Sequence, residues 1–146
     1  MNDFQNKLAV VFGGGRDIGG AVAVELARRG AQVAFSYQSS DPGSVIDAIA
    51  ATGQTPYSQK VDAMDMAAVR KFAVSSAERA GKQISVLVNV VGGLIARKRM
   101  EEMDDAFWDQ VMTLNTKSIF AMTQASLPLM IDGGAIVNVS SQAGRD

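Results

Sequence analysis

The sequence contains no cysteine and no histidine. Without thiols the chain can form no disulfide and carry out no thiol chemistry, and without imidazole it lacks the commonest general base near neutral pH. Most transition-metal sites are excluded for the same reason. Any acid–base chemistry must therefore come from other side chains, and we expect no metal site.

Net charge and long apolar runs are also missing. The 146 residues carry a formal net charge of −1, which gives no electrostatic case for binding nucleic acid or a membrane surface. No apolar run is long enough to span a bilayer, and the N-terminus lacks the basic-then-apolar pattern of a signal sequence. We therefore expect a cytoplasmic protein. A hydrophobic content of 47% and a charged content of 20% are typical of one ordinary globular domain.

One stretch near the N-terminus organises the rest of the chain. The five apolar residues 8–12 are typical of a parallel-sheet strand buried on both faces. Glycines occupy positions 13–15, and an apolar helix face is then expected from the spacing of Ile18, Val22 and Leu26. A turn without Cβ atoms lets a pyrophosphate approach the backbone, and a helix N-terminus offers unpaired N–H groups. The order strand, glycine turn, helix predicts a nucleotide-binding loop, although a tight turn in an unrelated α/β protein would look similar.

Strand and helix patterns alternate along the remaining sequence. We expect helices that end near Gly30 and at Thr52-Gly53, a helix capped by Asp65 that ends at Gly81, a long helix from Asp104 to Met130 and a turn at Asp132-Gly133-Gly134; strands are expected at residues 33–35, 57–61, 84–88 and 135–139. Methionines at helical spacing are interpreted as core residues. The alternation with short connections predicts a doubly wound parallel sheet of the Rossmann type, formed by one dinucleotide-binding domain over residues 1–146.

Five polar or glycine-rich motifs follow the expected elements in order. They are Gly13-Gly14-Gly15-Arg16-Asp17-Ile18-Gly19, Asp62, Asn89-Val90-Val91-Gly92, Asn115 and Ser141. With them the chain resembles the N-terminal part of a short-chain dehydrogenase/reductase, and it is most similar to the 3-oxoacyl-carrier-protein reductase branch. The glycine motif corresponds to the TGxxxGxG loop of that family, and Asn89 to Gly92 corresponds to its NNAG motif.

The resemblance assigns roles to individual residues. Asp62 would hold the adenine, Asn115 would organise a proton-relay water, and Ser141 would hydrogen-bond the substrate oxygen. The predicted catalytic residues are Asn115 and Ser141, and the predicted cofactor-binding residues are Gly13, Gly15, Arg16, Ile18, Gly19, Tyr37, Gln38, Asp62, Ala63, Asn89 and Gly92. Each role has a simpler alternative: Asn115 as an exposed helix residue, and Asp62 and Ser141 as turn residues at strand ends.

Three departures from the family pattern concern the glycine loop. Phe12 replaces a threonine whose hydroxyl ties the loop to the fourth strand, and Val90-Val91 replaces Asn-Ala at the other end of that tie. Asp17 replaces a glycine. We interpret Asp17 as a helix-start residue, able to cap the helix, whose carboxylate points away from the cofactor phosphates.

The family's acid–base pair is missing from the sequence. Its chemistry uses Tyr-x-x-x-Lys, in which the lysine lowers a phenol pKa that is otherwise about 10. The two tyrosines, Tyr37 and Tyr57, are followed four residues later by Asp41 and Val61, so neither forms this pair. We therefore predict that the 146 residues are part of a longer enzyme, lacking its C-terminal strands and helices, and that alone they are inactive and prone to aggregate.

Cofactor selectivity is read from the end of the second strand. NAD-selective sites place a carboxylate there, whereas this sequence has none before Asp41, and Arg16 offers a cation for a 2′-phosphate. NADP(H) is thus the predicted cofactor and NAD(H) the alternative. The basic run 97–99 is either a solvated loop or a guide for an anionic substrate.

The predicted function is hydride transfer between NADP(H) and a carbonyl/alcohol pair, with a ketone or 3-oxoacyl compound as substrate. The family further implies a homo-oligomer, a dimer or a tetramer. A non-catalytic dinucleotide-binding domain, acting as a sensor or assembly partner, is the alternative. A Rossmann-like domain for another nucleotide is a third hypothesis, against which Asp62 and Asn115 argue.

Overall fold

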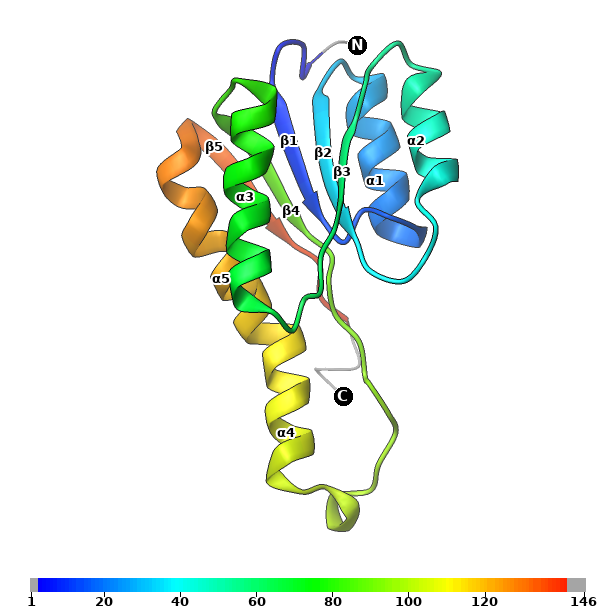
Figure 1. Ribbon diagram of the computed structural model, residues 1–146, viewed down its shortest axis with the longest axis vertical. Coiled ribbons are helices and arrows are strands. Elements are labelled where there is room, and N and C mark those ends of the chain that lie inside the picture. The colour runs from blue at the N-terminus through cyan, green and yellow to red at the C-terminus, as the bar shows by residue number, and fades with distance from the viewer. Residues whose placement is uncertain (1–2, 142–146) are drawn as a thin grey trace.

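The computed structural model describes residues 3–141 as a parallel sheet with helices on both faces (Figure 1). The sheet has five strands in the order β3-β2-β1-β4-β5. Its elements are β1 (Leu8–Phe12), α1 (Asp17–Arg28), β2 (Gln32–Tyr37), α2 (Gly43–Ala50), β3 (Tyr57–Lys60), α3 (Met66–Ala80), β4 (Ile84–Asn89), α4 (Asp105–Met112), α5 (Ser118–Ser126) and β5 (Met130–Asn138), with short 3₁₀ turns at Met100–Glu102 and Leu127–Leu129. The doubly wound parallel sheet predicted from the sequence is confirmed.

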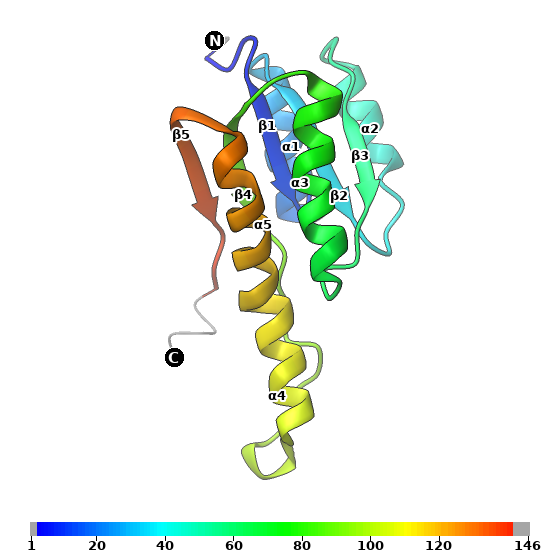
Figure 2. The same cartoon turned by 60° about the vertical axis from the view of Figure 1, so that its left-hand side comes forward.

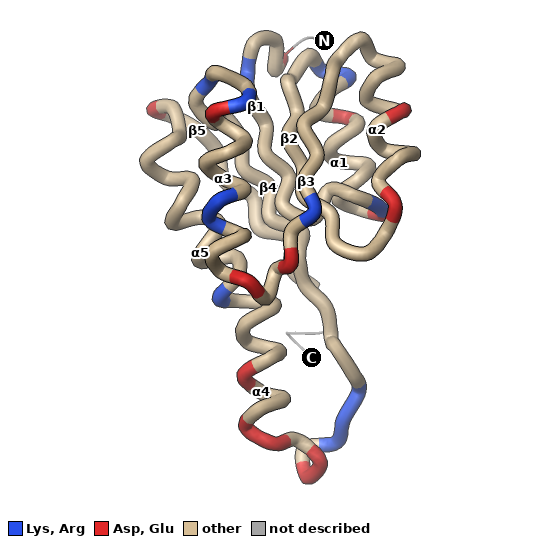
Figure 3. Tube along the Cα trace, viewed as in Figure 1, with Lys and Arg blue, Asp and Glu red and all other residues tan. Residues whose placement is uncertain are grey.

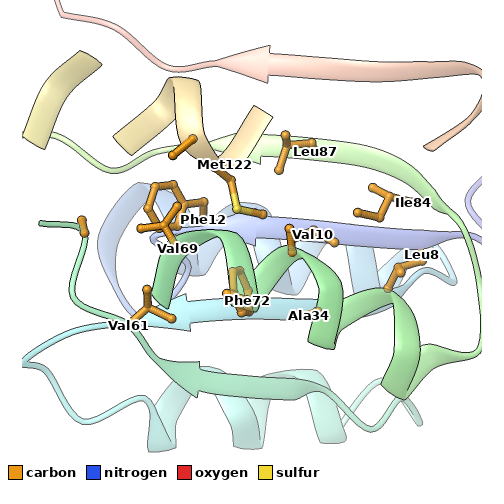
Figure 4. Packing of buried hydrophobic residues seen from close by; sticks show 13 residues of the cluster. Leu8, Val10, Phe12, Ala34, Val61, Val69, Phe72, Ile84, Leu87 and Met122 are labelled. Carbon is orange, nitrogen blue, oxygen red and sulfur yellow. The ribbon is translucent and has the colours of Figure 1, made fainter. Parts of the chain in front are cut away.

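The central strand β1 is buried along its whole length between β2 and β4. Alternate side chains enter two separate clusters, as the period of two in a strand requires. Leu8, Val10 and Phe12 pack beneath α3 and α5 (Figure 4), whereas Ala9 and Val11 pack beneath α1 and α2. The continuous apolar run therefore reflects burial on both faces.

The helix α1 lies close to the sheet through small residues. Its buried positions are Gly19, Gly20, Ala23, Leu26 and Ala27. The expectation that Ile18 begins the buried face was wrong, since its side chain is 61% exposed at the first turn. Small residues on the inner face set the distance between helix and sheet, and Ile18 lies instead with Phe4 and Val22 along an open groove on the side of α1.

Both predicted ends of α3 and the predicted start of α4 are confirmed. Asp65 accepts hydrogen bonds from the amides of Ala67 and Ala68 at 2.9 and 3.0 Å, and Gly81 ends α3 with a φ of +60°. Asp104 accepts from the Phe107 amide at 2.8 Å. Capping carboxylates at both N-termini satisfy amides that the helix itself leaves unpaired.

The long helix predicted from Asp104 onward is interrupted by a π turn. Residues Thr113–Lys117 form this turn between α4 and α5. Figures 1 and 2 show α5 against the sheet beside α3, while α4 and the loop before it project beyond the carboxyl ends of the strands. A π turn contains one residue more than an α-helical turn, and here it lies where the helical segment leaves the sheet.

Two further expectations were wrong. The strand β5 begins at Met130, and the glycines expected to form a turn lie within it, where the pairing register with β4 shifts and Gly133 has a φ of +75°. The methionines are also less buried than expected: Met122 is fully buried, but Met100 is 81% exposed. Helical spacing was misleading there because α4 and its loop extend past the sheet. Within residues 3–141, no helix is both long and apolar enough to cross a membrane.

Candidate functional site

The predicted site residues gather at the carboxyl ends of the strands. The chain turns in opposite directions from β1, which pairs with β2 on one side and β4 on the other, so the loops after β1 and β4 meet at a topological switch point. Open α/β sheets bind their ligands there. Gly13 lies against the β4 loop: a Cβ placed on it would be 2.9 Å from Val91 Cγ2 and 3.1 Å from the Val91 nitrogen.

The glycine loop leads directly into the N-terminus of α1. Gly13 has a φ of +93°, a conformation that favours glycine, and Arg16 is the N-cap residue. The Arg16 side chain makes no capping hydrogen bond, so this helix end lacks the side-chain cap seen on α3 and α4. Asp17, interpreted from the sequence as a helix-start residue, is the first residue of α1, with a φ of +47° and a carboxylate 3.4 Å from Arg16 Nε.

The ends of β2 and β3 form the next part of the edge. Gln38 Nε2 donates to Asp62 Oδ1 at 3.2 Å, and the same oxygen accepts from the Met64 amide at 2.9 Å. Tyr37 packs under the glycine loop, since a Cβ on Gly15 would lie 2.6 Å from Tyr37 Cβ. The structure therefore brings together residues that are 24 positions apart in the sequence.

Two predicted cofactor contacts are buried. Ala63 is 3% exposed and belongs to the core cluster beneath α3, which leaves its backbone for any ligand contact. Asn89 is 1% exposed, and its Nδ2 donates to Asn138 Oδ1 in β5 at 2.8 Å. Asn89 thus links the ends of β4 and β5.

Asn115 occupies the π turn and fastens the β4 loop. Its Oδ1 accepts from the Gly93 amide at 2.9 Å, and its Nδ2 donates to the Gly93 carbonyl at 2.8 Å and to the Val111 carbonyl at 2.9 Å. Gly92 lies against the same side chain, because a Cβ on it would be 2.9 Å from Asn115 Oδ1. Sequence reasoning named Asn115 and Gly92 but missed Gly93, whose only signal was its place beside another glycine.

Ser141 follows β5 at the same edge and is exposed. Neither tyrosine offers an acid–base group there in combination with a lysine. Tyr57 lies in β3, where its hydroxyl donates to Gln59 Oε1 at 2.6 Å and its ring stacks on Phe72. The described residues therefore supply the glycine loop, the side-chain amide of Asn115 and the hydroxyl of Ser141. The Tyr-x-x-x-Lys pair is missing from the sequence.

The basic run 97–99 lies on the projection formed with α4, and acidic residues lie close to it along the chain (Figure 3). Lys98 Nζ lies 4.5 Å from the centroid of the Phe107 ring, and Arg99 pairs with Glu101 at 3.9 Å. These contacts engage two of the three cations locally, as in a solvated loop.

The fold and the glycine loop at the switch point define a doubly wound protein of the nucleotide-binding type. The sequence profile described as short chain dehydrogenase matches residues 7–146. The chain belongs to the short-chain dehydrogenase/reductase family.

Named relatives and solved structures agree with this assignment. A 3beta-hydroxysteroid dehydrogenase of Mediterraneibacter gnavus is 36% identical over 146 residues, which are 99% of this chain and 52% of the relative. A hydroxynaphthalene reductase-like protein Arp2 of Metarhizium majus is 35% identical over 95% of this chain and 52% of its own. A short-chain dehydrogenase/reductase from Serratia marcescens superposes with a TM-score of 0.92 at 31% identity, over 98% of this chain and 58% of that one.

An NADH-dependent reductase, A1-R′, solved in complex with NAD, superposes with a TM-score of 0.89 at 31% identity over 99% of this chain and 63% of its own. The 146 residues thus span about half the length of the curated relatives that they match.

Proposed function

We propose that this chain is the cofactor-binding part of an oxidoreductase that transfers hydride between NADP(H) and a carbonyl/alcohol substrate, a ketone or a 3-oxoacyl compound. The observation that carries the proposal is the contact of Gly13 with the β4 loop at the switch point. A backbone without a Cβ at this point, next to a helix N-terminus without a side-chain cap, fits a pyrophosphate. The nicotinamide of the bound cofactor would supply or accept the hydride.

The chain's own residues divide the remaining work. Gly13, Gly15, Ile18 and Gly19 surround the pyrophosphate position, Tyr37 and Gln38 lie at the ribose end, and Asp62 with the Ala63 backbone lies at the adenine end. Ser141 would donate a hydrogen bond to the substrate oxygen, and Asn115 would hold a water through the Gly93 loop. The proton itself is assigned to a Tyr-x-x-x-Lys pair in a longer chain, because the family's chemistry needs it and this sequence lacks it.

Two observations favour NADP(H) over NAD(H). The carboxylate that comes first after β2, Asp41, accepts a hydrogen bond from the Gly43 amide at 3.0 Å and is thereby turned toward the start of α2. Arg16 and Arg28 line an open groove of about 750 Å³ together with Ser44, and the carboxylates of Asp17 and Glu25 line it as well, so cations and a hydroxyl lie on the side of the loop that faces α2. Both features suit a 2′-phosphate.

Measured binding and turnover test the proposal. The 146-residue chain should bind NADPH more tightly than NADH in calorimetry, without turnover. A longer form that carries the Tyr-x-x-x-Lys pair should oxidise NADPH in the presence of β-ketoesters or cyclic ketones. Binding without turnover in that longer form would favour the alternative, a dinucleotide-binding sensor or assembly partner. Binding of neither dinucleotide would overturn both the oxidoreductase and the sensor hypothesis.

We also propose a cytoplasmic homo-oligomer, a dimer or tetramer, as is common in the family. Sedimentation of the longer form would test the oligomeric state.

A further inference from the structure

Ser36 contacts the glycine loop through two different atoms. It lies in β2 and is 2% exposed. Its Oγ accepts a hydrogen bond from the Gly13 amide at 2.8 Å, and its carbonyl accepts one from the Gly14 amide at 2.8 Å. One strand residue therefore satisfies two successive amides of the loop.

The neighbouring strand β1 provides no side-chain contact of this kind. Phe12, the residue before the glycines, points into the cluster beneath α3 and α5, close to Val69 (Figure 4), and is 1% exposed. Its link to the β4 loop is made by the backbone, since the Val90 amide donates to the Phe12 carbonyl at 2.9 Å. The loop is thus held from the β2 side by a hydroxyl.

The loop also lies directly on β2. A Cβ placed on Gly14 would be 2.6 Å from Phe35 Cβ, closer than two such atoms approach in proteins. Gly14 is buried against β2, and Gly13 before it is half-buried. A partly buried amide that loses its acceptor destabilises the conformation that removes it from water. Among residues 3–141, the acceptor of the Gly13 amide is the Ser36 hydroxyl.

We propose that Ser36 is a positioning residue for the cofactor: its hydroxyl fixes the glycine loop on β2 and so places the first amides of α1 at the pyrophosphate. The inference rests on the proposed function, because it assumes that this loop binds a dinucleotide. The Gly13 and Gly14 amides donate to Ser36, so phosphate must be bound by amides later in the loop and in α1. The inference therefore gives Gly13 a steric role only, which is to let the cofactor approach a backbone without a Cβ.

The test compares Ser36→Ala with Ser76→Ala in the 146-residue chain. Ser76 is a matched control because it is fully buried and its Oγ also makes one hydrogen bond, to the Phe72 carbonyl at 2.7 Å, but within α3. Both substitutions remove one buried hydroxyl and should lower the unfolding midpoint in urea. Only Ser36→Ala should weaken NADPH binding, about tenfold, and speed hydrogen exchange at the Gly13 amide. Ser36→Thr, which keeps a hydroxyl, should restore both.

The outcomes separate the inference from the function on which it rests. If the unaltered chain binds neither NADPH nor NADH, the proposed function and the inference both fail. If the unaltered chain binds and Ser36→Ala binds equally well, only the role of Ser36 is overturned. Equal losses of affinity in Ser36→Ala and Ser76→Ala would likewise reduce Ser36 to a general contribution to stability. If Ser36→Ala does not fold, Ser36→Thr is compared with the unaltered chain. Hydrogen exchange at the Gly13 amide that is as slow as in the unaltered chain, with unaltered NADPH affinity, supports the inference. Faster exchange at this amide contradicts it.

Discussion

Asn115 and Gly93 form a reciprocal pair of hydrogen bonds. The side-chain amide of Asn115 pairs with the backbone N–H and C=O of Gly93, as the backbone of a neighbouring strand would. The Gly93 amide donates to Asn115 Oδ1 at 2.9 Å, and Asn115 Nδ2 donates to the Gly93 carbonyl at 2.8 Å. The pair fastens the loop after β4 to the π turn. It therefore links the end of the sheet to the helix that projects from it.

Asn115→Ala should loosen this loop. We expect the free energy of unfolding to fall by about 1–2 kcal/mol, because hydrogen bonds to partly solvated groups contribute about 1 kcal/mol each. Urea denaturation of the chain measures this, with Thr116→Ala, an exposed neighbour in the same π turn, as the control. Equal stability of the two variants would show that the pair contributes nothing to folding.

Gly13→Val should abolish dinucleotide binding. A side chain at this position must adopt a positive φ and displace Val91, so the loop cannot keep its contact with the β4 loop. Gly53→Val is the matched control, because Gly53 also has a positive φ, +85°, but no atom within 4 Å of an added Cβ. Calorimetry with NADPH should detect no binding for folded Gly13→Val and full affinity for Gly53→Val. Unchanged affinity of Gly13→Val would exclude this loop as the pyrophosphate site.

Arg16 and Asp17 should have opposite effects on cofactor selectivity. Arg16→Ala should remove most of the preference for NADPH over NADH, a loss of about tenfold to a hundredfold for a charge-assisted contact. Asp17→Asn should increase that preference, because it frees Arg16 from the carboxylate 3.4 Å away. Dissociation constants for both cofactors check this. Equal constants in the unaltered chain would contradict the assignment of NADP(H).

Glu25 should titrate below its ordinary range. Its hydrogen bond with Arg29 lowers the carboxyl pKa from 4.5, and the charges of Arg29 and Arg28 act in the same direction. Because the pKa is lower in the folded chain, this pair's contribution to stability is fully present above pH 4.5 and is lost as the pH falls through the lowered pKa. An NMR titration of Glu25 should show the pKa rising in Arg29→Gln and rising less in Arg28→Gln. Identical titrations in all three chains would refute the pairing.

The helices α4 and α5 should drive self-association. Trp108, Phe120 and Leu127 are 61%, 57% and 56% exposed. Large exposed apolar side chains on one helical segment favour aggregation or association. Trp108→Lys/Leu127→Lys should lower concentration-dependent light scattering, whereas Gln110→Lys/Thr116→Lys, which adds the same charge at exposed polar positions, should not. Equal effects of the two pairs would attribute the change to net charge.

Much of the fold could be predicted because local patterns and packing agree. The apolar run at β1 had to be buried on both faces, and Asp65 and Gly81 marked the ends of α3 through chemistry that acts within one turn. The family resemblance, carried by motifs in a fixed order, also predicted which strand ends would meet. These features depend on residues that are neighbours in the sequence or on the single topology that parallel strands and short connections allow.

The tertiary structure decided what depends on contacts between distant residues. Ile18 is exposed although its spacing matches a buried helix face, because small residues of α1 make the contact with the sheet and Ile18 lies along an open groove on the side of the helix. The glycines before Ala135 continue β5 because β4 pairs with them through a register shift. Ser36 is unremarkable as one residue of an apolar strand; only folding, which brings the Gly13 amide to its hydroxyl across 23 residues, gives it a partner. Sequence determined the elements and their order, since those follow from local propensity and burial, while the positions of side chains at the site followed from how the strands and helices pack.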